Sequence, residues 1–227
     1  MLLEHKNIFT SEECKSLIKL CSSDIRTISA SNPYSSKAEF FFTPENHLKG
    51  NVFDVKDKKI DWAINRFCDR LKVNPEHLEH PRLQEYIVGG TYRDHYDFIL
   101  LDYKYTDYHL SRGGQRVRSF ILYLNDDFEG GETHFSKQNI VIKPETGKII
   151  EWTNVIPSID TKSKESYNWD TLHGSSPVIK GTKYIFAIFE REQKFIGTPQ
   201  EWSNRFPTQP SENESKVKGI PNENKRD

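Results

Sequence analysis

Apolar residues recur at helical spacing in two segments near the start of the chain. The segment FTSEECKSLIKLCSS has Thr10 three residues before Glu13, which is the capping-box pattern of a helix start, and then one apolar face. It predicts a helix over residues 11–22. The segment DKKIDWAINRFCDRLK, residues 57–72, has isoleucine, phenylalanine and leucine at the same period and predicts a second helix.

The pattern changes to short strands after residue 82. β-Branched and aromatic residues fill five runs that are separated by glycine, asparagine, aspartate or proline. These runs predict strands at residues 83–89, 117–125, 139–143, 148–152 and 183–190. Before them, the Ser-, Asn- and Pro-rich residues 29–50 predict a long loop, with one short strand near Phe40 in the EFFF motif.

Helices followed by closely spaced strands indicate the fold class. We expect a mainly β protein with flanking helices (α+β), in which N-terminal helices pack on a double-stranded β-helix, or jelly roll. The chain is expected to form a single domain over residues 1–208, with a helical part at about 1–80 and the jelly-roll core at about 82–192. Residues 209–227 are too polar to be buried and predict a flexible tail.

Composition and charge narrow the class of protein. The 227 residues carry a formal net charge of −1, so no global field attracts the chain to nucleic acid or to a membrane surface. The first residues lack the apolar run of a signal peptide, and no segment approaches the roughly 20 apolar residues of a membrane span. We therefore expect a soluble, cytoplasmic protein without a membrane partner. An odd number of cysteines, three, argues against a disulfide framework and a zinc finger.

The segment YRDHYDF holds the first candidate for chemistry. It is predicted to be a strand, so His95 and Asp97 point to the same face. A His-x-Asp pair alone arises often by chance and is most often a pair of surface residues. A third ligand changes that interpretation. His109 lies in a predicted polar loop, and His134 points opposite to its neighbour Thr133, so only one of those two neighbours faces the interior.

His173 stands directly before a turn and the last predicted strand. Together with His95 and Asp97 it would form a facial triad of two imidazoles and one carboxylate, a ligand set that suits iron(II) and leaves three of its positions open. Ten residues later, Lys183 opens the apolar strand. Because burying an unpaired ammonium is costly, Lys183 lies either at an exposed strand end or against an anion, such as the carboxylate of a metal-bound ligand.

Four segments, taken in order, resemble the prolyl 4-hydroxylase branch of the iron(II)- and 2-oxoglutarate-dependent dioxygenases. They run from about Leu83 to Glu190 and read YIVGGTYRDHYDF, RSFILYLNDDFEGGETHF, VIKPETGKIIEW and LHGSSPVIKGTKY. Each fragment alone is weak evidence, because short motifs recur by chance. Their order, with the lysine ten residues after the second histidine, makes the resemblance specific.

The resemblance implies roles for the matching residues. His95, Asp97 and His173 would bind iron. Lys183 would pair with the distal carboxylate of 2-oxoglutarate, and Tyr86 would form a hydrogen bond with this cosubstrate. The resemblance thus gives a task to the lysine as well as to the three metal ligands.

Four further positions match the branch less closely. Thr133, in the GGET element, and Tyr123, in the YLN turn, would line the cosubstrate pocket. Arg118 stands near a basic residue of the branch, where it would contact substrate or only pack its aliphatic stem. Phe189 occupies a position where the branch often has tryptophan, and it still provides a flat apolar wall.

The same resemblance implies the reaction and its cofactors. Iron(II), 2-oxoglutarate and dioxygen are expected, and ascorbate accompanies them in the branch. The reaction would hydroxylate an unactivated C–H bond and release succinate and carbon dioxide. We expect a prolyl residue in a peptide or protein as the substrate, with a free amino acid or another small molecule as the alternative, because fold and cosubstrate site do not fix the substrate.

Three other functions remain open from the sequence. A jelly-roll binding protein without catalysis would not need the intact set of ligands. A zinc hydrolase could use three protein ligands and a water molecule, but it leaves Lys183 and Tyr86 without a role. A nucleic-acid demethylase of the same superfamily is disfavoured, because the chain lacks a basic stripe and has Lys183 where those enzymes usually present arginine.

Overall fold

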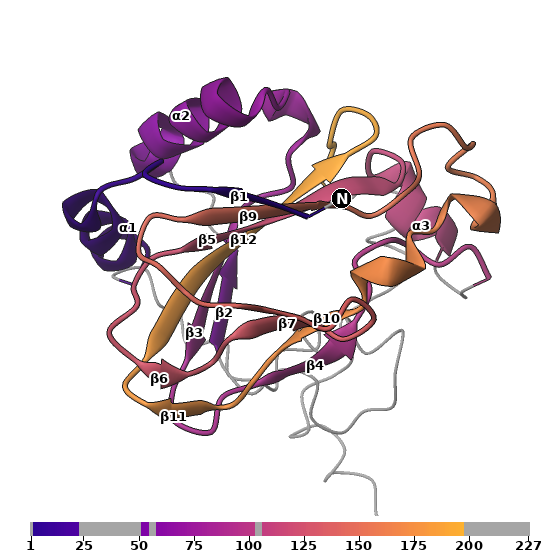
Figure 1. Ribbon diagram of the computed structural model, residues 1–227. Coiled ribbons are helices and arrows are strands. Elements are labelled where there is room, and N and C mark those ends of the chain that lie inside the picture. The colour runs from indigo at the N-terminus through magenta and orange to yellow at the C-terminus, as the bar shows by residue number, and fades with distance from the viewer. Residues whose placement is uncertain (1, 23–50, 55–57, 103–105, 198–227) are drawn as a thin grey trace, which may run out of the picture. The chain divides into compact units, whose positions relative to one another are not determined.

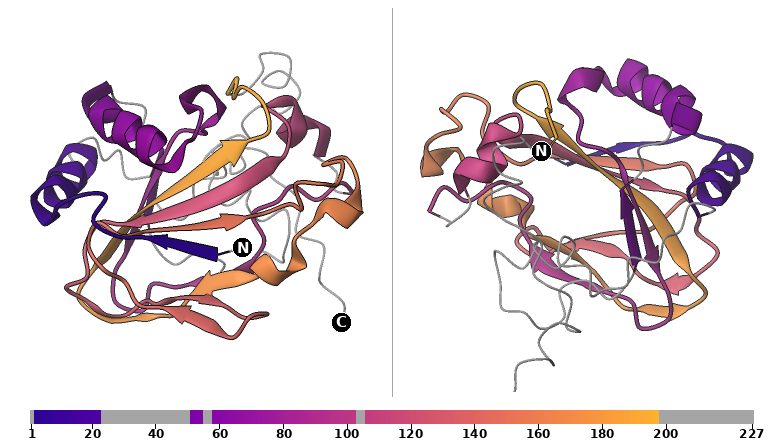
Figure 2. Two further views of the ribbon diagram at one scale, coloured as in Figure 1. Left: turned by 45° about the horizontal axis from the view of Figure 1, so that its top comes forward. Right: turned by 180° about the vertical axis from the view of Figure 1, so that it is seen from behind.

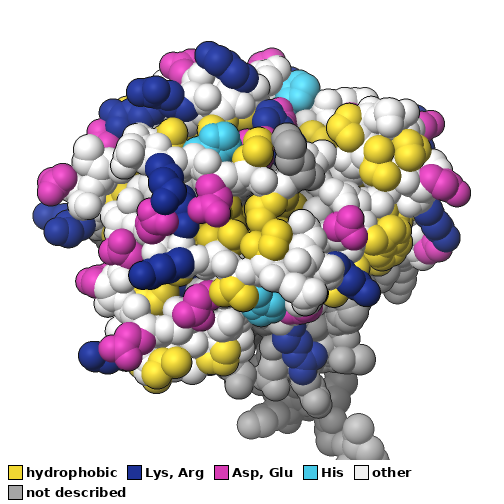
Figure 3. Space-filling view, viewed as in Figure 1, with side chains coloured by type: hydrophobic (Ala, Val, Ile, Leu, Met, Phe, Trp, Pro, Cys, Tyr) yellow, Lys and Arg dark blue, Asp and Glu magenta, His cyan; other side chains and the backbone are white. Residues whose placement is uncertain are grey.

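The computed structural model describes residues 2–22, 51–54, 58–102 and 106–197. Three predictions lie outside these residues: the long loop at residues 29–50, the short strand near Phe40 within it, and the domain end at 208 with the polar tail beyond it. Within the described ranges no helix has the length and apolar character needed to cross a bilayer. Acidic and basic side chains are mixed over the face drawn in Figure 3.

A large antiparallel sheet contains four of the five apolar strands that the sequence predicts, and the fifth, predicted at residues 139–143, lies in a smaller sheet. The strand order of the large sheet is β1-β9-β5-β12-β3-β2. In that order the strands span Leu2–His5, Ile149–Thr153, Arg116–Tyr123, Lys183–Arg191, Arg82–Tyr86 and Asn51–Asp54. The long central strands β5 and β12 carry β-branched and aromatic residues, which favour a pleated surface buried on both faces.

A smaller sheet lies across from the large one, as Figures 1 and 2 show. Its order is β4-β10-β7-β8, and a separate two-stranded sheet pairs β11 with β6. These six strands span Tyr92–His95, His173–Ser175, Thr133–Phe135, Ile140–Ile142, Val178–Lys180 and Glu129–Gly130. Two facing antiparallel sheets with flanking helices confirm the predicted jelly roll.

Two helices cover the face of the large sheet that is turned away from the small sheet (Figures 1 and 2). They are α1 (Ser11–Ser22) and α2 (Asp61–Leu71), close to the predicted ranges. The predicted capping box forms at α1, since the Glu13 amide donates to Thr10 Oγ1 at 3.2 Å and the Thr10 amide donates to Glu13 Oε2 at 2.9 Å. Each helix buries one apolar stripe against the sheet.

The alternation of side chains on β5 separates two apolar clusters. Phe120 and Leu122 pack with the helices, and the Phe120 ring meets the edge of Phe67 from α2 at a centroid distance of 5.0 Å. Ile121 and Tyr123 point the other way, into the cluster between the sheets. The space between the sheets is therefore on the face of β5 that carries odd-numbered residues from 119 onward.

Several short elements differ from the prediction. The polar loop predicted around His109 contains α3 (Thr106–Ser111), and β1 and β2 were not predicted. In the described part of the chain, four 3-10 turns also form, at Lys58–Ile60, Pro75–His77, Lys164–Ser166 and Trp169–Thr171. Elements of two to six residues depend on pairing and packing with distant segments, so local periodicity does not reveal them.

Candidate metal centre and anion pocket

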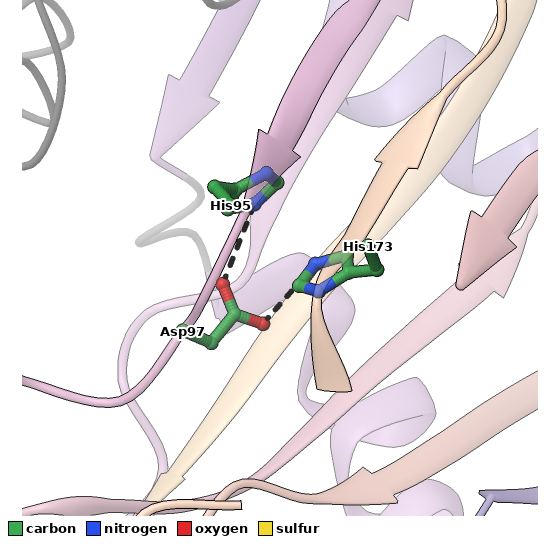
Figure 4. A group of neighbouring side chains, drawn as sticks. All are labelled: His95, Asp97 and His173. Atoms are coloured by element: carbon green, nitrogen blue, oxygen red, sulfur yellow. Dashed lines mark ion pairs between the residues drawn. The ribbon is translucent and has the colours of Figure 1, made fainter. Parts of the chain in front are cut away.

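Three side chains converge where β4 and β10 pair. His95 ends β4, Asp97 follows two residues later, and His173 begins β10 opposite His95. Asp97 Oδ1 lies 3.6 Å from His95 Nε2, and Asp97 Oδ2 lies 3.6 Å from His173 Nε2 (Figure 4). Ligand atoms of the three residues all lie within 4.8 Å of one another. The structure thus brings together the three predicted metal ligands.

Backbone carbonyl groups fix the orientation of both imidazole rings. Nδ1 of His95 lies 2.8 Å from the carbonyl oxygen of Arg93, and Nδ1 of His173 lies 2.8 Å from that of Thr171. A carbonyl oxygen only accepts hydrogen bonds, so each neutral ring carries its hydrogen on Nδ1 and its lone pair on Nε2. Both lone pairs face Asp97, which is the arrangement that metal-binding histidines adopt.

The buried Asp97 is kept ionised by its surroundings. Burial alone would raise its pKa, but the positive charges that His173 and His95 carry when protonated, the Arg116 guanidinium and a hydrogen bond from Ser119 outweigh burial and lower the pKa of this carboxyl. The sequence did not identify Ser119. Ser119 could be recognised only from its position on β5, on the face opposite Phe120. That position is informative only when it is known which face of the sheet is turned toward the metal ligands.

The donor set fits a divalent metal ion. The 3.6 Å separations are too long for hydrogen bonds, so neutral imidazole nitrogens and a carboxylate face one another across a gap. Two imidazoles and one carboxylate suit iron(II), with open coordination positions, and a zinc ion can use the same ligands. The geometry of the three residues therefore admits both metals.

Aromatic rings enclose the two histidines. Tyr92 stacks on His95 with ring centroids 3.9 Å apart. The Trp152 ring approaches His173 at 4.6 Å and Phe135 approaches it at 5.6 Å. These walls limit the access of water, which strengthens the electrostatic interactions within the site.

Lys183 lies in the interior and not at an exposed strand end. Its side chain is 1% exposed, so the exposed-end alternative is wrong. The ammonium donates to the carbonyl oxygen of Gly131 at 2.7 Å and to Ser175 Oγ at 2.8 Å, which uses two of its three hydrogens. Among the described residues it forms no ion pair, and burial lowers its pKa to about 7. A buried ammonium without a carboxylate partner in the described part of the chain is a candidate partner for an anion, and the group of residues around it is here called the anion pocket.

The anion pocket adjoins the three candidate ligands. Ser175, which contacts Lys183, stands two residues after His173 on β10, so both point to the same face of that strand. The sequence did not identify Ser175. Its contact joins the β12 lysine to the strand that carries the second histidine.

Tyrosine and threonine hydroxyl groups line the pocket beside Lys183. The Lys183 ammonium lies 4.9 Å from the ring centroid of Tyr86 and 6.0 Å from that of Tyr123. The Tyr123 hydroxyl donates to Thr133 Oγ1 at 2.7 Å, which leaves the threonine hydrogen free to turn toward a ligand. Burial raises the pKa of both tyrosines, so they remain neutral donors. The four residues predicted for the cosubstrate therefore lie near one another, and their role in binding it stays a prediction.

Thr133, and not His134, faces the interior. Thr133 is buried, whereas His134 is half-buried and its Nε2 lies 2.6 Å from Asp94 Oδ1. His109 belongs to α3 and stays neutral, because burial and nearby arginines lower its pKa to about 3. Neither histidine joins the candidate metal centre.

Arg118 lies on the face of the large sheet that the helices cover. It donates to Glu190 at 2.5 Å and to Glu151 at 2.9 Å, and its guanidinium lies 5.3 Å from the Phe120 ring centroid. Ser119, which contacts Asp97, points to the opposite face. These contacts support the packing alternative that the sequence left open for Arg118, not a contact with substrate.

Comparison with known proteins agrees with this geometry. Residues 81–191 match the model of the 2OG-Fe(II) oxygenase superfamily. Two curated relatives of Arabidopsis thaliana are "Probable prolyl 4-hydroxylase 8", 29% identical, and "Prolyl 4-hydroxylase 5", 28% identical; each alignment covers 79% of this chain and 64% of the relative. The chain therefore spans less than two thirds of the length of these relatives.

A solved structure shares the fold. The viral collagen prolyl hydroxylase of Paramecium Bursaria Chlorella virus-1, determined as a 2OG complex, superposes with a TM-score of 0.59. It is 21% identical in sequence, and the match covers 84% of this chain and 95% of the viral one. The family match, the jelly roll and the convergent His-Asp-His group agree with one another: residues 81–191 resemble the 2OG-Fe(II) oxygenase superfamily, and curated relatives of the chain are named as prolyl 4-hydroxylases.

Proposed function

We propose that the protein is an iron(II)- and 2-oxoglutarate-dependent oxygenase that hydroxylates a prolyl residue in a peptide or protein. The observation that carries this proposal is the convergence of His95, Asp97 and His173 beside the buried ammonium of Lys183, which forms no ion pair with another described residue. A metal centre alone would also suit a zinc hydrolase. An adjoining pocket for an anion gives the oxygenase its second requirement, a place for the distal carboxylate of the cosubstrate.

In this proposal each residue has a defined task. His95 Nε2, His173 Nε2 and the Asp97 carboxylate hold iron(II), and the bound iron supplies activation of dioxygen for C–H hydroxylation. Lys183 and Thr133 bind the distal carboxylate of 2-oxoglutarate by charge-assisted hydrogen bonds. Tyr92 and the other aromatic walls exclude water.

The prolyl substrate is supported by similarity to the relatives and not by a contact within this chain. The curated plant relatives are named as prolyl 4-hydroxylases. A free amino acid is the alternative substrate, since the same site would serve both. A substrate screen should therefore compare proline-containing peptides with free proline and detect the gain of one oxygen atom by mass spectrometry.

The cosubstrate site can be tested by an anaerobic titration of the metal-free protein with iron(II) and then 2-oxoglutarate. We expect a visible metal-to-ligand charge-transfer band that requires both additions and is lost in His173→Ala. His5→Ala is the matched control, because His5 lies on β1 and pairs with Glu151, outside the group of three ligands. A folded wild-type protein that gives no band would contradict the proposal and favour a zinc enzyme or a binding protein.

A further inference from the structure

A buried amide lies next to the predicted cosubstrate tyrosine. Gln84 and Tyr86 stand two residues apart on β3, so their side chains share the inner face of the large sheet. Gln84 is 7% exposed and pairs across the sheet with Ile185, a member of the apolar cluster between the sheets. The neighbouring residues Tyr86, Tyr123 and Ile185 belong to this apolar cluster, so the amide of Gln84 is a polar group in apolar surroundings.

The amide makes one hydrogen bond through its side chain among the described residues. The Tyr86 hydroxyl donates to Gln84 Oε1 at 2.5 Å. A buried amide group without a partner is destabilising, so a leucine or methionine would fill this space at lower cost. The hydrogen bond to Tyr86 is therefore the feature that distinguishes glutamine from an apolar residue at this position.

This hydrogen bond conflicts with the task proposed for Tyr86. A phenol has one hydrogen to donate, and the ionised carboxylate of 2-oxoglutarate can only accept. While the Tyr86 hydroxyl donates to Gln84, it presents only lone pairs to the pocket. The hydroxyl hydrogen must therefore leave Gln84 before Tyr86 can bind the cosubstrate.

Rotation of the Gln84 amide by about 180° resolves the conflict. The oxygen and nitrogen of a glutamine amide have nearly the same shape, and the network of hydrogen bonds decides which of them points to a given partner. After rotation, the amide N–H donates to the Tyr86 oxygen, and the Tyr86 hydrogen is free to donate to a carboxylate. No proton is transferred: the hydrogen bond between Gln84 and Tyr86 reverses its direction, and the Tyr86 hydroxyl gains a new acceptor.

We propose that Gln84 is a positioning residue for cosubstrate binding, which orients the Tyr86 hydroxyl by changing from acceptor in the empty pocket to donor in the loaded one. The inference rests on the proposed function, because it assumes that the anion beside Lys183 is 2-oxoglutarate. It extends that function by a residue that acts on the cosubstrate only through Tyr86.

A double-mutant cycle on the dissociation constant of 2-oxoglutarate tests this role. Binding is measured by isothermal titration calorimetry under anaerobic conditions with manganese(II) in the metal centre, so no turnover is needed. We expect Gln84→Met to weaken binding about 3- to 10-fold, as the loss of one hydrogen bond does, and Tyr86→Phe to have an effect of similar size. In the Tyr86→Phe background, Gln84→Met should change the dissociation constant less than about 2-fold.

A second variant keeps the shape of the side chain and changes its chemistry. Gln84→Glu places an ionised carboxylate in the same space, which accepts from Tyr86 but cannot donate, and which also repels the cosubstrate. We expect it to weaken binding more than about 10-fold, more than Gln84→Met does. Gln138→Met is the matched control, because Gln138 is exposed and bonds the carbonyl of Asp170 outside the pocket. Thermal unfolding of every variant confirms that it is folded.

The outcomes separate this inference from the proposed function. If the effects of Gln84→Met and Tyr86→Phe are additive, Gln84 acts by packing alone and the inference is overturned while the function stands. If Gln84→Glu binds 2-oxoglutarate as tightly as the wild type, the donor role is also refuted. If the folded wild-type protein with manganese(II) binds no 2-oxoglutarate, the proposed function and the inference fall together.

Discussion

At the scale of a single residue, Lys183 decides how the pocket responds to pH. Its ammonium is buried and its pKa is lowered to about 7, with burial as the main cause. The group is therefore about half protonated at neutral pH in the empty pocket. Because only the charged form attracts an anion, binding of 2-oxoglutarate above pH 7 must be accompanied by uptake of a proton.

We predict that the dissociation constant of 2-oxoglutarate rises with pH above about 7, by up to about tenfold per pH unit, and is nearly constant below pH 6. The affinity falls as pH rises because the Lys183 ammonium is already protonated below its pKa. Above that pKa, Lys183 must take up a proton when the cosubstrate binds. Calorimetry in two buffers of different ionisation enthalpy would measure both the affinity and the proton uptake.

Lys183→Arg provides the control for this prediction, since a guanidinium stays charged over the whole range. If the arginine variant binds the cosubstrate, its affinity should show no such rise between pH 7 and pH 9. A wild-type affinity that does not change over that range would show that Lys183 is already fully charged in the empty protein.

The residues for which a direct chemical role is proposed could be predicted from the sequence, and their supporting partners could not. His95 and Asp97 follow from strand periodicity, and Lys183 follows from the cost of burying a charge. Ser119 and Gln84 belong to the same site but are set by which strand lies opposite which. That information is held in the register of the sheet, which no local pattern contains.

At the scale of an element, the turn before β9 is fixed by a close approach to the segment that leads into α1. Gly147 has φ of +79°, and a Cβ at this position would lie 2.0 Å from the carbonyl oxygen of Phe9. The Gly147 amide also donates to the carbonyl of Tyr123 at 2.9 Å. Glycine is required here both by the backbone conformation and by the lack of space.

We predict that Gly147→Ala lowers the free energy of unfolding more than Gly89→Ala does. Gly89 has nearly the same φ, +80°, but no atom lies within 4 Å of its Cβ position. Gly89→Ala should therefore lower the free energy of unfolding only by the cost of a left-handed backbone conformation at alanine, about 1–2 kcal/mol. Gly147→Ala should lower the free energy of unfolding by about 1–3 kcal/mol more than Gly89→Ala, because the neighbouring backbone must move.

Urea unfolding monitored by circular dichroism would measure the two values. Equal losses for Gly89→Ala and Gly147→Ala would show that the segment at Phe9 gives way at no cost. That result would also mean that the contact between the turn and the start of α1 does not hold the helix on the sheet.

Long elements could be predicted and short ones could not, for a physical reason. The helices over 11–22 and 61–71 and the strand over 183–191 each carry enough apolar residues to define their own period. The edge strand Leu2–His5 has four residues and exists because β9 offers its backbone groups. The helix over 106–111 lies in a polar segment whose local composition indicates a loop.

At the scale of the whole molecule, one buried carboxylate joins the three strands β3, β5 and β12. Glu79 is 2% exposed and receives two hydrogen bonds from Arg116, at 2.6 and 2.9 Å. Arg82 donates to it at 3.2 Å, and Arg191 Nε lies 2.7 Å from it. Burial would raise the pKa of Glu79, but the three guanidinium groups outweigh it and hold the pKa well below its usual value.

The network also depends on an irregularity in the sheet. The pairing of β12 with β5 shifts between Glu190 and Arg191, so that Glu190 pairs with Arg118 and Arg191 pairs with Arg116. As a result Arg116 stacks on the Phe189 ring at 3.9 Å and contacts Glu79, whereas Arg118 faces the helices. Strict alternation would have put both arginines on one face, which is why the sequence could not separate their roles.

The last prediction concerns the removal of this shared charge. Glu79→Gln keeps the shape of the side chain but leaves three guanidinium groups, one of them fully buried, without their carboxylate. We expect the free energy of unfolding to fall by about 3–5 kcal/mol, the range for breaking a buried ion pair, out of a total of about 5–15 kcal/mol.

The control is Glu129→Gln, which removes an exposed carboxylate paired with Lys180, their side chains being 62% and 76% exposed. Its loss should stay below about 1 kcal/mol, as for other surface pairs, when both variants are unfolded in urea. The comparison isolates the effect of burial on stability, because each substitution removes one ion-paired carboxylate and the two carboxylates differ in exposure. A small loss in both would mean that water reaches the guanidinium groups around Glu79, and the junction of β3, β5 and β12 would then be held by its apolar neighbours alone.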